Sequence, residues 1–433
     1  MSPANMSGMD RLVERFLSYI AIDTSSDPAS DRIPSTAGQL TLGKKLLEEL
    51  SRLGVRAQMD KNGIVYGHLP ANSRKSGLPA IGFVAHMDTP PGLNSRGIRP
   101  RFIKNYDGSP IILHEKNQLI LAPEQDPFLP GLIGHDLITT DGTTILGADD
   151  KAGIAELVTM LDILVHNPGF AHGPVYTAFS VDEEIGRGMA CFDPELFPCD
   201  FAYTVDIDGN DISCLDYETF CGGWTEVNVL GRPMHPGTGA GILRNACTMA
   251  MELHCSLPLR LDPYYSREYE GIIHLAAFTG RPEHAHMRYR VCSFEENVLW
   301  EQMHQIERAA KALNTAYGFP AFSVSMRQSS PNIKTCVMRD PRCLEYAKRA
   351  MAAAGLLVKH RPIRGGTDGI PLAERGIPAP NLNNGSYHAL SFQEMVSVTQ
   401  MKQCVEIFLK IVSAEGTQSQ LQCQRRYRVR SVI

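Results

Sequence analysis

Residues 137–158, LITTDGTTILGADDKAGIAELV, decide the fold: two adjacent acids, Asp149 and Asp150, follow an apolar segment and a Gly-Ala pair. Apolar residues then recur at helical spacing from Ile154 to Leu161, which predicts a loop, an acid pair and a helix N-terminus. One acid is explained as a cap on the first backbone N–H groups of the helix. The other is free for a different partner, and a single carboxylate can bridge two cations.

Composition limits the classes of protein. The chain has 433 residues, 43% of them hydrophobic, so it can bury a large core in two or more domains. A net charge of −5 gives no basic surface for nucleic acid, and the apolar stretches are too short to span a membrane. The N-terminal segment is amphipathic and has no apolar signal core, and the eleven cysteines form no CxxC pair. We therefore expect a reduced, cytoplasmic protein.

Four apolar stretches of strand length are each followed by acids or a histidine. Such runs predict strands buried on both faces of a mostly parallel sheet, whose C-terminal edge is where ligands bind. The stretches are residues 79–85, 173–181, 201–205 and 377–382. The side chains expected at that edge, together with Asp149, are His86, Asp88, Glu183, Glu184, Asp206 and His388.

The segment 216–330 has a different rhythm. Its expected elements follow a β-α-β-β-α-β order, which is that of a ferredoxin-like domain, with helices at 237–257 and 295–317. The sequence thus predicts an α/β catalytic domain made of residues 1–215 and 331–413, with helices flanking the sheet and an inserted α+β lid at 216–330. Further helices are expected at 33–53 and 393–412, and residues 414–433 are expected to be a disordered tail.

The predicted edge is rich in carboxylates, has two histidines and contains no sulfur. This donor set suits two divalent cations, most plausibly Zn²⁺, with Mn²⁺ or Co²⁺ as alternatives. We expect His86 and Asp206 to bind the first ion, Glu184 and His388 the second, and Asp149 to bridge them. A lone acid or histidine at a strand end is usually a cap or a surface group, but seven of them on one edge weaken that explanation.

Two acids remain for catalysis. Asp88 is expected to orient and tune His86, and Glu183 to act as general base on metal-bound water before passing the proton to the leaving nitrogen. Other chemistries have little support, because no G-x-S-x-G occurs and the glycine-rich residues 365–369 lack the Lys-Ser/Thr of a phosphate loop. Arg364, just before them, is placed either to hold a substrate carboxylate or in a surface turn.

The chain resembles the peptidase T family of zinc-dependent co-catalytic metallopeptidases, aminotripeptidases related to carboxypeptidase G and aminoacylase. The resemblance runs from about residue 9 to 412 and is carried by IPSTAGQ, AIGFVAHMDT, LITTDGTTILGADDKAGIAE, DEEIGRG, AYTVD, HPGT and PIRGGTDG. It implies a two-zinc catalytic domain of zinc-exopeptidase type, an inserted lid, and release of the N-terminal residue from tripeptides. It also implies the same ligands, tuning acid and base, with His235, Asn245 and Arg364 contacting substrate.

Three positions depart from the family pattern. Asp206 is followed by Ile-Asp instead of Gly-Gly, which places Asp208 beside the metals. The lid arginine falls on Cys292, and Arg290, which shares that strand face, is the expected substitute. His388 lies further from the following glutamate, Glu394, than the family histidine does.

The first functional hypothesis is therefore a cytoplasmic dinuclear zinc aminopeptidase acting on short peptides, most plausibly tripeptides. A dipeptidase, a carboxypeptidase-like enzyme or an N-acyl amino acid deacylase of the same chemistry is the alternative. A non-catalytic peptide- or metal-binding relative is the alternative from another class, although such a protein needs neither Glu183 nor Asp88. Short peptides are the expected partners, and a homodimer is compatible with a lid of this type.

Overall fold

The computed structural model describes residues 9, 11–206 and 211–414. They fall into two compact units: unit 1 comprises Met1–Tyr217, Thr335–Arg361 and Thr367–Ile433, and unit 2 comprises Glu218–Lys334 and Pro362–Gly366. The sequence places the domain boundaries at 215/216 and 330/331, within four residues of these. It does not anticipate that the short segment Pro362–Gly366 belongs with unit 2.

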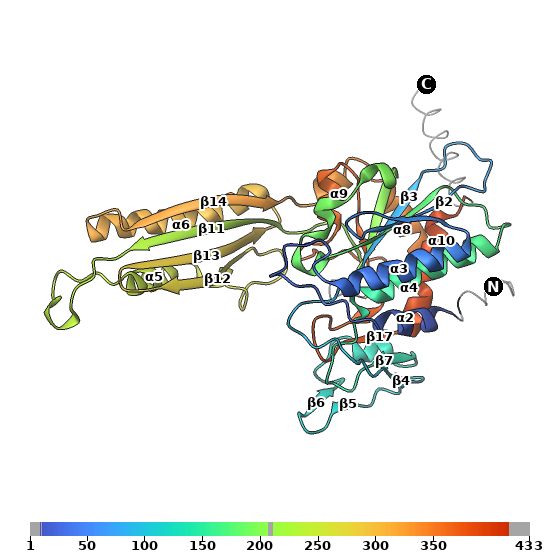
Figure 1. The fold of residues 1–433 in the computed structure, drawn as a ribbon, viewed down its shortest axis with the longest axis horizontal. Coiled ribbons are helices and arrows are strands. Elements are labelled where there is room, and N and C mark those ends of the chain that lie inside the picture. The colour runs from blue at the N-terminus through green and yellow to red at the C-terminus, as the bar shows by residue number, and fades with distance from the viewer. Residues whose placement is uncertain (1–8, 10, 207–210, 415–433) are drawn as a thin grey trace. The chain divides into compact units, whose positions relative to one another are not determined.

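Unit 1 is organised around a seven-stranded mixed sheet with the order β1-β2-β8-β3-β9-β15-β10 (Figure 1). Strands β8, β3, β9 and β15 are parallel, and β1, β2 and β10 pair antiparallel at the two sides. The bounds are β1 Arg56–Met59, β2 Val65–Leu69, β3 Ile81–His86, β8 Val175–Ser180, β9 Phe201–Val205, β10 Leu215–Asp216 and β15 Asn381–Leu382. The central strands coincide with the apolar runs because both of their faces are buried.

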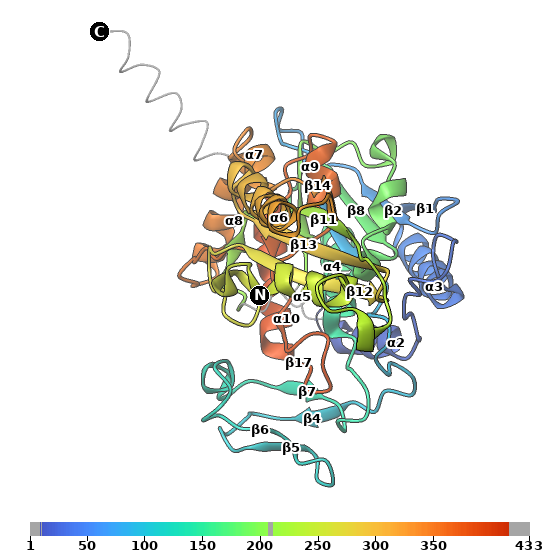
Figure 2. The same ribbon diagram turned by 90° about the vertical axis from the view of Figure 1, so that its left-hand side faces the viewer.

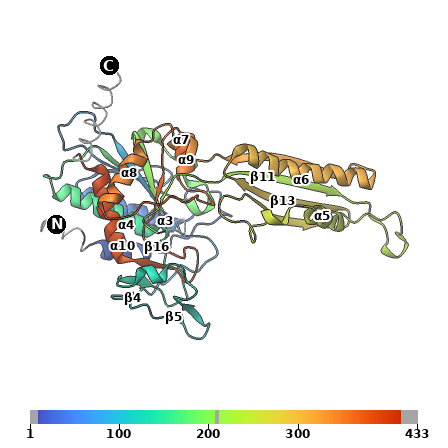
Figure 3. The same ribbon diagram turned by 180° about the vertical axis from the view of Figure 1, so that it is seen from behind.

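Helices pack against this sheet and against one another, and Figure 3 shows α10 beside α4 and α8. Their bounds are α2 Leu12–Ile20, α3 Ala37–Leu53, α4 Ala148–His166, α7 Lys334–Val337, α8 Arg342–Ala353, α9 Gly369–Glu374 and α10 Val398–Val412. Two expected helices are shorter than predicted, because residues 33–36 form a bend and because β17 (Met395–Ser397) precedes α10. None of the helices in the described ranges has the length and hydropathy needed to span a bilayer.

The Pro- and Gly-rich residues after β3 build a smaller part of unit 1. It holds a sheet with the order β16-β17-β7-β4, a β5-β6 hairpin and its own apolar cluster, which includes Leu129, Leu137 and Tyr387. The bounds are β4 Arg101–Ile103, β5 Ile111–His114, β6 Leu119–Leu121, β7 Leu137–Thr139 and β16 Ser386–Tyr387. Short 3₁₀ turns of unit 1 are η1 Leu129–Leu132, η2 Glu183–Ile185, η3 Gly188–Cys191 and η4 Pro194–Leu196.

Unit 2 is a four-stranded antiparallel sheet with the order β12-β13-β11-β14, which Figure 2 shows strand by strand. Its elements are β11 Cys221–Leu230, η5 Pro236–Thr238, α5 Ala246–Cys255, η6 Leu259–Leu261, β12 Ile272–Gly280, β13 His284–Ser293, α6 Glu296–Tyr317 and β14 Phe322–Ser330. Both long helices pack on the sheet around a core that includes Val227, Met287 and Ile306. This is the predicted ferredoxin-like order. However, α5 begins nine residues later than expected, because the Pro- and Gly-rich residues before it form a loop.

Candidate metal centre

The candidate site of unit 1 lies at the C-terminal ends of neighbouring parallel strands. His86 is the last residue of β3, and Asp206 follows the last residue of β9 directly. The backbone N–H of Asp206 donates to the carbonyl of Leu382 in the next strand at 3.0 Å. This hydrogen bond fixes the backbone of Asp206 at the end of the sheet. Parallel pairing thus brings together side chains that are far apart in the sequence.

Both ring nitrogens of His86 face carboxylates. Its Nε2 is 3.0 Å from Oδ1 of Asp149 and 3.9 Å from Oδ1 of Asp206, whereas Nδ1 is 3.1 Å from the carbonyl oxygen of Asp88 and 3.4 Å from its Oδ1. All four residues are buried. A Zn²⁺ with bonds of about 2 Å separates its ligand atoms by about 3.3 Å, so the spacing around Nε2 fits one ion. An acid on the opposite ring nitrogen is the usual way to fix the tautomer of a histidine ligand.

Two sets of donor atoms in the described chain are close enough to hold an ion. One set is His86, Asp149 and Glu184, and the other is His86, Asp150 and Asp206. His86 is the only histidine in either set. The first set thus joins His86 with the predicted bridge Asp149 and with Glu184, whereas Asp206 shares the second set with His86 and Asp150.

Asp149 is held in place by a residue that the sequence did not reveal. It opens α4 with non-helical backbone angles, just after Gly147 in the left-handed region at φ 70°. Buried Glu394 accepts three backbone N–H bonds from this turn, from Leu146 at 2.7 Å, Gly147 at 2.8 Å and Asp149 at 3.0 Å. Glu394 is a positioning residue that lies 245 residues away along the chain, so no local pattern could identify it.

The second acid of the pair, Asp150, also has a definite place. Its Oδ2 accepts the backbone N–H of His86 at 3.1 Å and its Oδ1 accepts the side-chain amide of Asn384 at 2.7 Å. Burial and the neighbouring carboxylates Asp206 and Asp149 raise the pKa of Asp150 well above its usual value. Asp150 thus links the end of β3 to Asn384 and holds the backbone of His86, the candidate ligand.

Glu183 and Glu184 lie on a turn that Asp88 holds from one side. The Oδ1 of Asp88 accepts the backbone N–H of Glu183 at 2.9 Å, and its Oδ2 accepts that of Glu184 at 3.2 Å. Asp88 is fully buried and also contacts His86, so it orients the imidazole and the turn together. The expected tuning role therefore comes with a second, positioning role.

On its other side, the turn is anchored to the IPSTAGQ segment. Asp182, in the left-handed region at φ 51°, accepts the backbone N–H of Ser35 at 2.7 Å and the side-chain amide of Gln39 at 2.7 Å. The Ser35 hydroxyl also donates to it. The carbonyl of the Gln39 side chain accepts the N–H of Asp182 at 3.0 Å. The bend at residues 33–36, which precedes α3, thus holds Asp182, the residue before Glu183.

The local electrostatics favour neutral carboxyl groups. Burial, followed by the charge of Asp149, raises the pKa of Glu184 to about 9, and burial raises the pKa of Glu183 well above its usual value. Burial opposes the charged form of His86, but hydrogen bonds with Asp149 and Asp88 raise its pKa well above the usual value. One Oε of Glu184 is buried without a hydrogen-bond partner. Such a site gains from a positive charge placed among its carboxylates.

Asp368 is another acid that the sequence analysis did not assign. It is buried, contacts the Ser180 hydroxyl at the end of β8, and burial raises its pKa to about 6. The GGTDG stretch is excluded as a phosphate loop and is part of a motif that carries the family resemblance, but neither observation gives Asp368 a role. Asp368 closes the carboxylate cluster from the side of β8.

His388 belongs to neither set of donor atoms in the described chain and has another acid as its partner. Its Nε2 is 2.6 Å from Oδ2 of Asp126, and its ring meets that of Phe128 edge-on at 5.7 Å. Asp126 is itself fixed by accepting the N–H groups of Phe128 and Leu129. The imidazole of His388 thus pairs with Asp126 in this structure, and its expected role beside Glu184 stays a prediction.

The expected substrate residues all belong to unit 2. His235 is exposed in the loop after β11, where its Nδ1 accepts the N–H of Gly237 at 3.2 Å. Asn245 caps α5 by accepting the N–H of Cys247 at 2.9 Å. Arg290 donates to the Ser329 hydroxyl at 2.6 Å, and Arg364 donates to the Ser266 hydroxyl and the Glu270 carbonyl. The Arg364 guanidinium is therefore used in part to hold the loop of unit 2 that contains Ser266 and Glu270.

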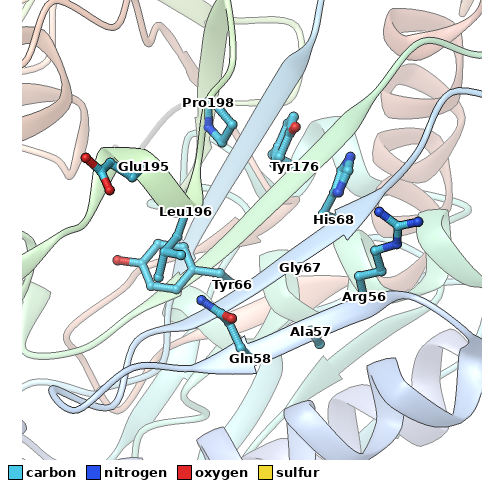
Figure 4. A pocket seen from close by; sticks show the side chains of 10 residues that line it. All are labelled: Arg56, Ala57, Gln58, Tyr66, Gly67, His68, Tyr176, Glu195, Leu196 and Pro198. Carbon is cyan, nitrogen blue, oxygen red and sulfur yellow. The ribbon is translucent and has the colours of Figure 1, made fainter.

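Other candidate features lie away from these acids or outside the described residues. A pocket of about 310 Å³ opens on β1 and β2, where His68 stacks on Tyr176 with ring centroids 4.4 Å apart (Figure 4). None of its lining residues belongs to the metal-type clusters. Asp208 and residues 415–433 of the expected tail fall outside the part of the chain that the structure describes.

Comparison with known proteins identifies the family, although no protein-family model matches the chain. Peptidase T of Caldanaerobacter subterraneus subsp. tengcongensis is 39% identical over 409 residues, 94% of this chain and 99% of its own. Peptidase T of Bacillus subtilis is 40% identical over 403 residues, 93% of this chain and 98% of its own.

Solved structures share the fold. Aminopeptidase PepT from Bacillus cereus matches with a TM-score of 0.73 at 23% identity, covering 93% of this chain and 98% of its own. The Bacillus subtilis protein YXEP, a dinuclear metal-binding peptidase of the M20 family, matches with a TM-score of 0.63 at 13% identity, covering 94% and 98%. The α/β fold is therefore confirmed, and the near-full-length identity shows that the chain belongs to the peptidase T family of metallopeptidases.

Proposed function

We propose that this chain is a metal-dependent aminopeptidase that hydrolyses the N-terminal peptide bond of short peptides, most favourably tripeptides. Membership of the peptidase T family supports the reaction class. The observation that carries the proposal is the convergence of His86, Asp149 and Glu184 into one donor set. Glu183 is adjacent to the candidate ligand Glu184, and its backbone N–H is held by Asp88, which also contacts His86.

The donor set supports a divalent cation, with Zn²⁺ as the proposed ion and Mn²⁺ or Co²⁺ as alternatives. Nε2 of His86 would hold it with carboxylate oxygens of Asp149 and Asp206, and Asp149 and Glu184 would hold a second ion. Bound cations of this kind polarise a carbonyl and lower the pKa of a water molecule. His86 is prepared for this role because Asp88 occupies its other ring nitrogen.

Within this site Glu183 is the proposed general base. Its carboxylate would take a proton from the attacking water and return it to the leaving amine nitrogen, so that no covalent enzyme intermediate is formed. Burial raises its pKa, and a base with a raised pKa is better matched to proton transfer near neutral pH. Asp88 supports the base by holding its backbone N–H.

The substrate residues are proposed from unit 2. His235 is free to reach a substrate oxygen because it is exposed, and Asn245 is proposed beside it although its side-chain oxygen caps α5. Arg290 and Arg364 are proposed to meet the peptide carboxylate. Arg290 is the stronger candidate, since Arg364 already donates to Ser266 and Glu270.

The proposal also covers the compartment in which the enzyme works and its oligomeric state. The ten described cysteines are free, which supports a reducing compartment such as the cytoplasm. Strand β12 lies at the edge of the unit 2 sheet and is largely exposed, so it offers a surface on which a second copy could pair to form a homodimer.

The test compares free and N-acylated tripeptides, dipeptides and tetrapeptides with the metal-loaded protein. We expect release of the N-terminal residue from free tripeptides. Cleavage of N-acylated substrates alone would instead identify a deacylase, and the absence of any hydrolysis would identify a binding protein. Glu183→Gln should lower kcat by at least about 100-fold while metal content stays unchanged, and Glu374→Gln, at an exposed position, is its control.

A further inference from the structure

The two candidate cation positions differ in their donor atoms. The first is built on His86 and Asp206, whose donor atoms lie in a single group with those of Asp150, and Nε2 of His86 is 3.9 Å from Oδ1 of Asp206. The second is built on Asp149 and Glu184, whose donor atoms lie with His86 in a single group. Since Nε2 can bind only one ion, the second position has oxygen donors from this group and no nitrogen.

His388, which the sequence predicts as the second histidine ligand, already has a charged partner in this structure. His388 and Asp126 form an ion-pair geometry at 2.6 Å, and their side chains are 24% and 5% exposed. The acid accepts two backbone N–H groups in addition, so it is a fixed partner rather than a mobile one. Moving the imidazole away would leave the nearly buried Asp126 carboxylate without its charged partner, which is unfavourable.

The chain after His388 is also anchored. Glu394 accepts the backbone N–H groups of Leu146, Gly147 and Asp149. Between these two residues the backbone passes through left-handed conformations at His388, φ 57°, and Leu390, φ 58°. The side chain of Leu390 is 49% exposed and offers no ligand atom. The segment that approaches the Asp149 turn therefore contributes Glu394 as a backbone acceptor and no imidazole.

From this geometry we propose that the two cation positions are unequal, a proposal that rests on the function proposed above. The position at His86 binds Zn²⁺ tightly. Among the described residues, its donor group offers the position at Glu184 carboxylate oxygens and no second imidazole, and this position takes a harder, oxygen-preferring cation of the Mn²⁺ or Mg²⁺ class. Nitrogen donors favour Zn²⁺, whereas carboxylate and water favour Mg²⁺ and Mn²⁺.

The loss of a nitrogen ligand sets the expected difference in Zn²⁺ affinity between the two positions. Disturbing even an outer partner of a metal ligand lowers affinity about 10- to 100-fold, so losing a nitrogen ligand should weaken Zn²⁺ at least tenfold. The one buried, unpartnered oxygen of Glu184 is then the main protein contribution to the second position. A heterodinuclear state, Zn²⁺ at His86 and Mn²⁺ at Glu184, is the expected form when both ions are supplied.

The experiment uses the full chain stripped of metal, dialysed against limiting Zn²⁺ with or without excess Mn²⁺. Metal content is then measured by mass spectrometry and Mn²⁺ binding by electron paramagnetic resonance. We expect one retained Zn²⁺ and one exchangeable Mn²⁺ per chain. Glu184→Gln should lose the Mn²⁺ and keep the Zn²⁺, and His86→Ala should lose the Zn²⁺.

His388→Ala is the decisive variant, because it lies outside both donor groups. Its two metal affinities should stay within about twofold of those of the parent protein. Retention of two equally tight Zn²⁺ ions, with one of them lost in His388→Ala, would overturn the proposal. Peptide hydrolysis is scored separately: a protein with unequal sites and no hydrolysis contradicts the proposed function only, and an active protein with two equal sites contradicts this inference only.

Discussion

Asp182 and Ser35 are joined by two hydrogen bonds, one from the backbone N–H of Ser35 at 2.7 Å and one from its hydroxyl. Both residues are buried, and Asp182 directly precedes the turn that carries Glu183. The position of the proposed base therefore depends on a loop that lies 147 residues earlier in the chain. Hydrogen bonds to a charged group contribute about 1.5–3 kcal/mol each to stability.

Ser35→Ala should therefore lower the free energy of unfolding by about 1.5–3 kcal/mol and should lower kcat, because the turn at Glu183 loses one of its supports. Urea unfolding and steady-state kinetics measure the two effects. Thr41→Ala, in the helix α3 that follows Ser35, is the control, since its hydroxyl is exposed and donates only to a backbone carbonyl. Equal effects of the two substitutions would show that the Ser35 hydroxyl does not support the turn.

The glycines of the same turn should respond very differently to alanine. At Gly188 an added Cβ would lie 1.3 Å from the carbonyl oxygen of Val181, so Gly188→Ala should prevent correct folding of the turn. At Gly186, φ 66°, an added Cβ meets nothing within 4 Å, and Gly186→Ala should cost only about 1–2 kcal/mol for the left-handed backbone. Soluble yield and thermal unfolding of both variants, compared directly, test this difference.

Glu394 should act on the metal ions through the backbone of Asp149. Glu394→Gln keeps the size of the side chain but places an amide N–H where three backbone N–H groups point. We expect the affinity for the first Zn²⁺ to fall about 10- to 100-fold, as for other groups that orient a ligand. Competition with a chromophoric chelator measures it, and Glu48→Gln, at an exposed position, should leave it unchanged.

The metal-free protein should become less stable as pH rises. The pKa of Glu184 is raised from 4.5 to about 9, so between these values the folded chain keeps a proton that the unfolded chain releases. The raised pKa values of Glu183 and His86 act in the same direction. Thermal unfolding in chelator should therefore occur at a lower temperature at pH 8.5 than at pH 6.0.

Metal binding should reverse this dependence, because a cation displaces those protons and binds more tightly as pH rises. Calorimetric titration in two buffers of different ionisation enthalpy counts the protons released. Glu184→Gln should release fewer protons and show a weaker pH dependence in chelator. A pH-independent unfolding temperature in the parent protein would contradict the raised pKa values.

The sequence predicted what depends on local pattern. Strand β9 covers the apolar run at 201–205, β8 lies within its run, and β3 ends one residue past its run, because a strand buried on both faces is apolar along its length. The strand-end rule then brought His86 and Asp206 to one edge. Unit 2 was predictable for the same reason, since the alternation along its strands and the periodicity of α6 are local signals.

The sequence could not reveal partners that only the tertiary fold creates. Glu394 and Asp182 act through backbone N–H groups or distant side chains, and no spacing rule connects them to the site. His388 is expected as a ligand from its order along the chain, which stays a prediction, and no local pattern indicates its contact with Asp126, 262 residues earlier. Resemblance to a family predicts which residue types are present at a site. The side chains that each of them contacts are visible only in the structure.

Arg290 should discriminate substrates by their C-terminal carboxylate. Its guanidinium lies 5.3 Å from the ring of Trp224, and it donates to Ser329. If it binds the peptide carboxylate, Arg290→Ala should raise KM for a free tripeptide about 10- to 100-fold, the equivalent of about 1.5–3 kcal/mol for a charge-assisted contact. It should leave KM for the corresponding tripeptide amide nearly unchanged.

Arg288→Ala is the matched control, because Arg288 lies on the same face of β13 and stacks on the same tryptophan at 3.8 Å. Arg288 is 3.7 Å from the Glu226 carboxylate, so its charge is already partnered within unit 2. Equal losses for the free peptide and the amide would show that Arg290 supports Trp224 rather than the substrate. A loss specific to the free carboxylate, found in Arg290→Ala alone, would assign to Arg290 the role that the arginine displaced by Cys292 has in the family.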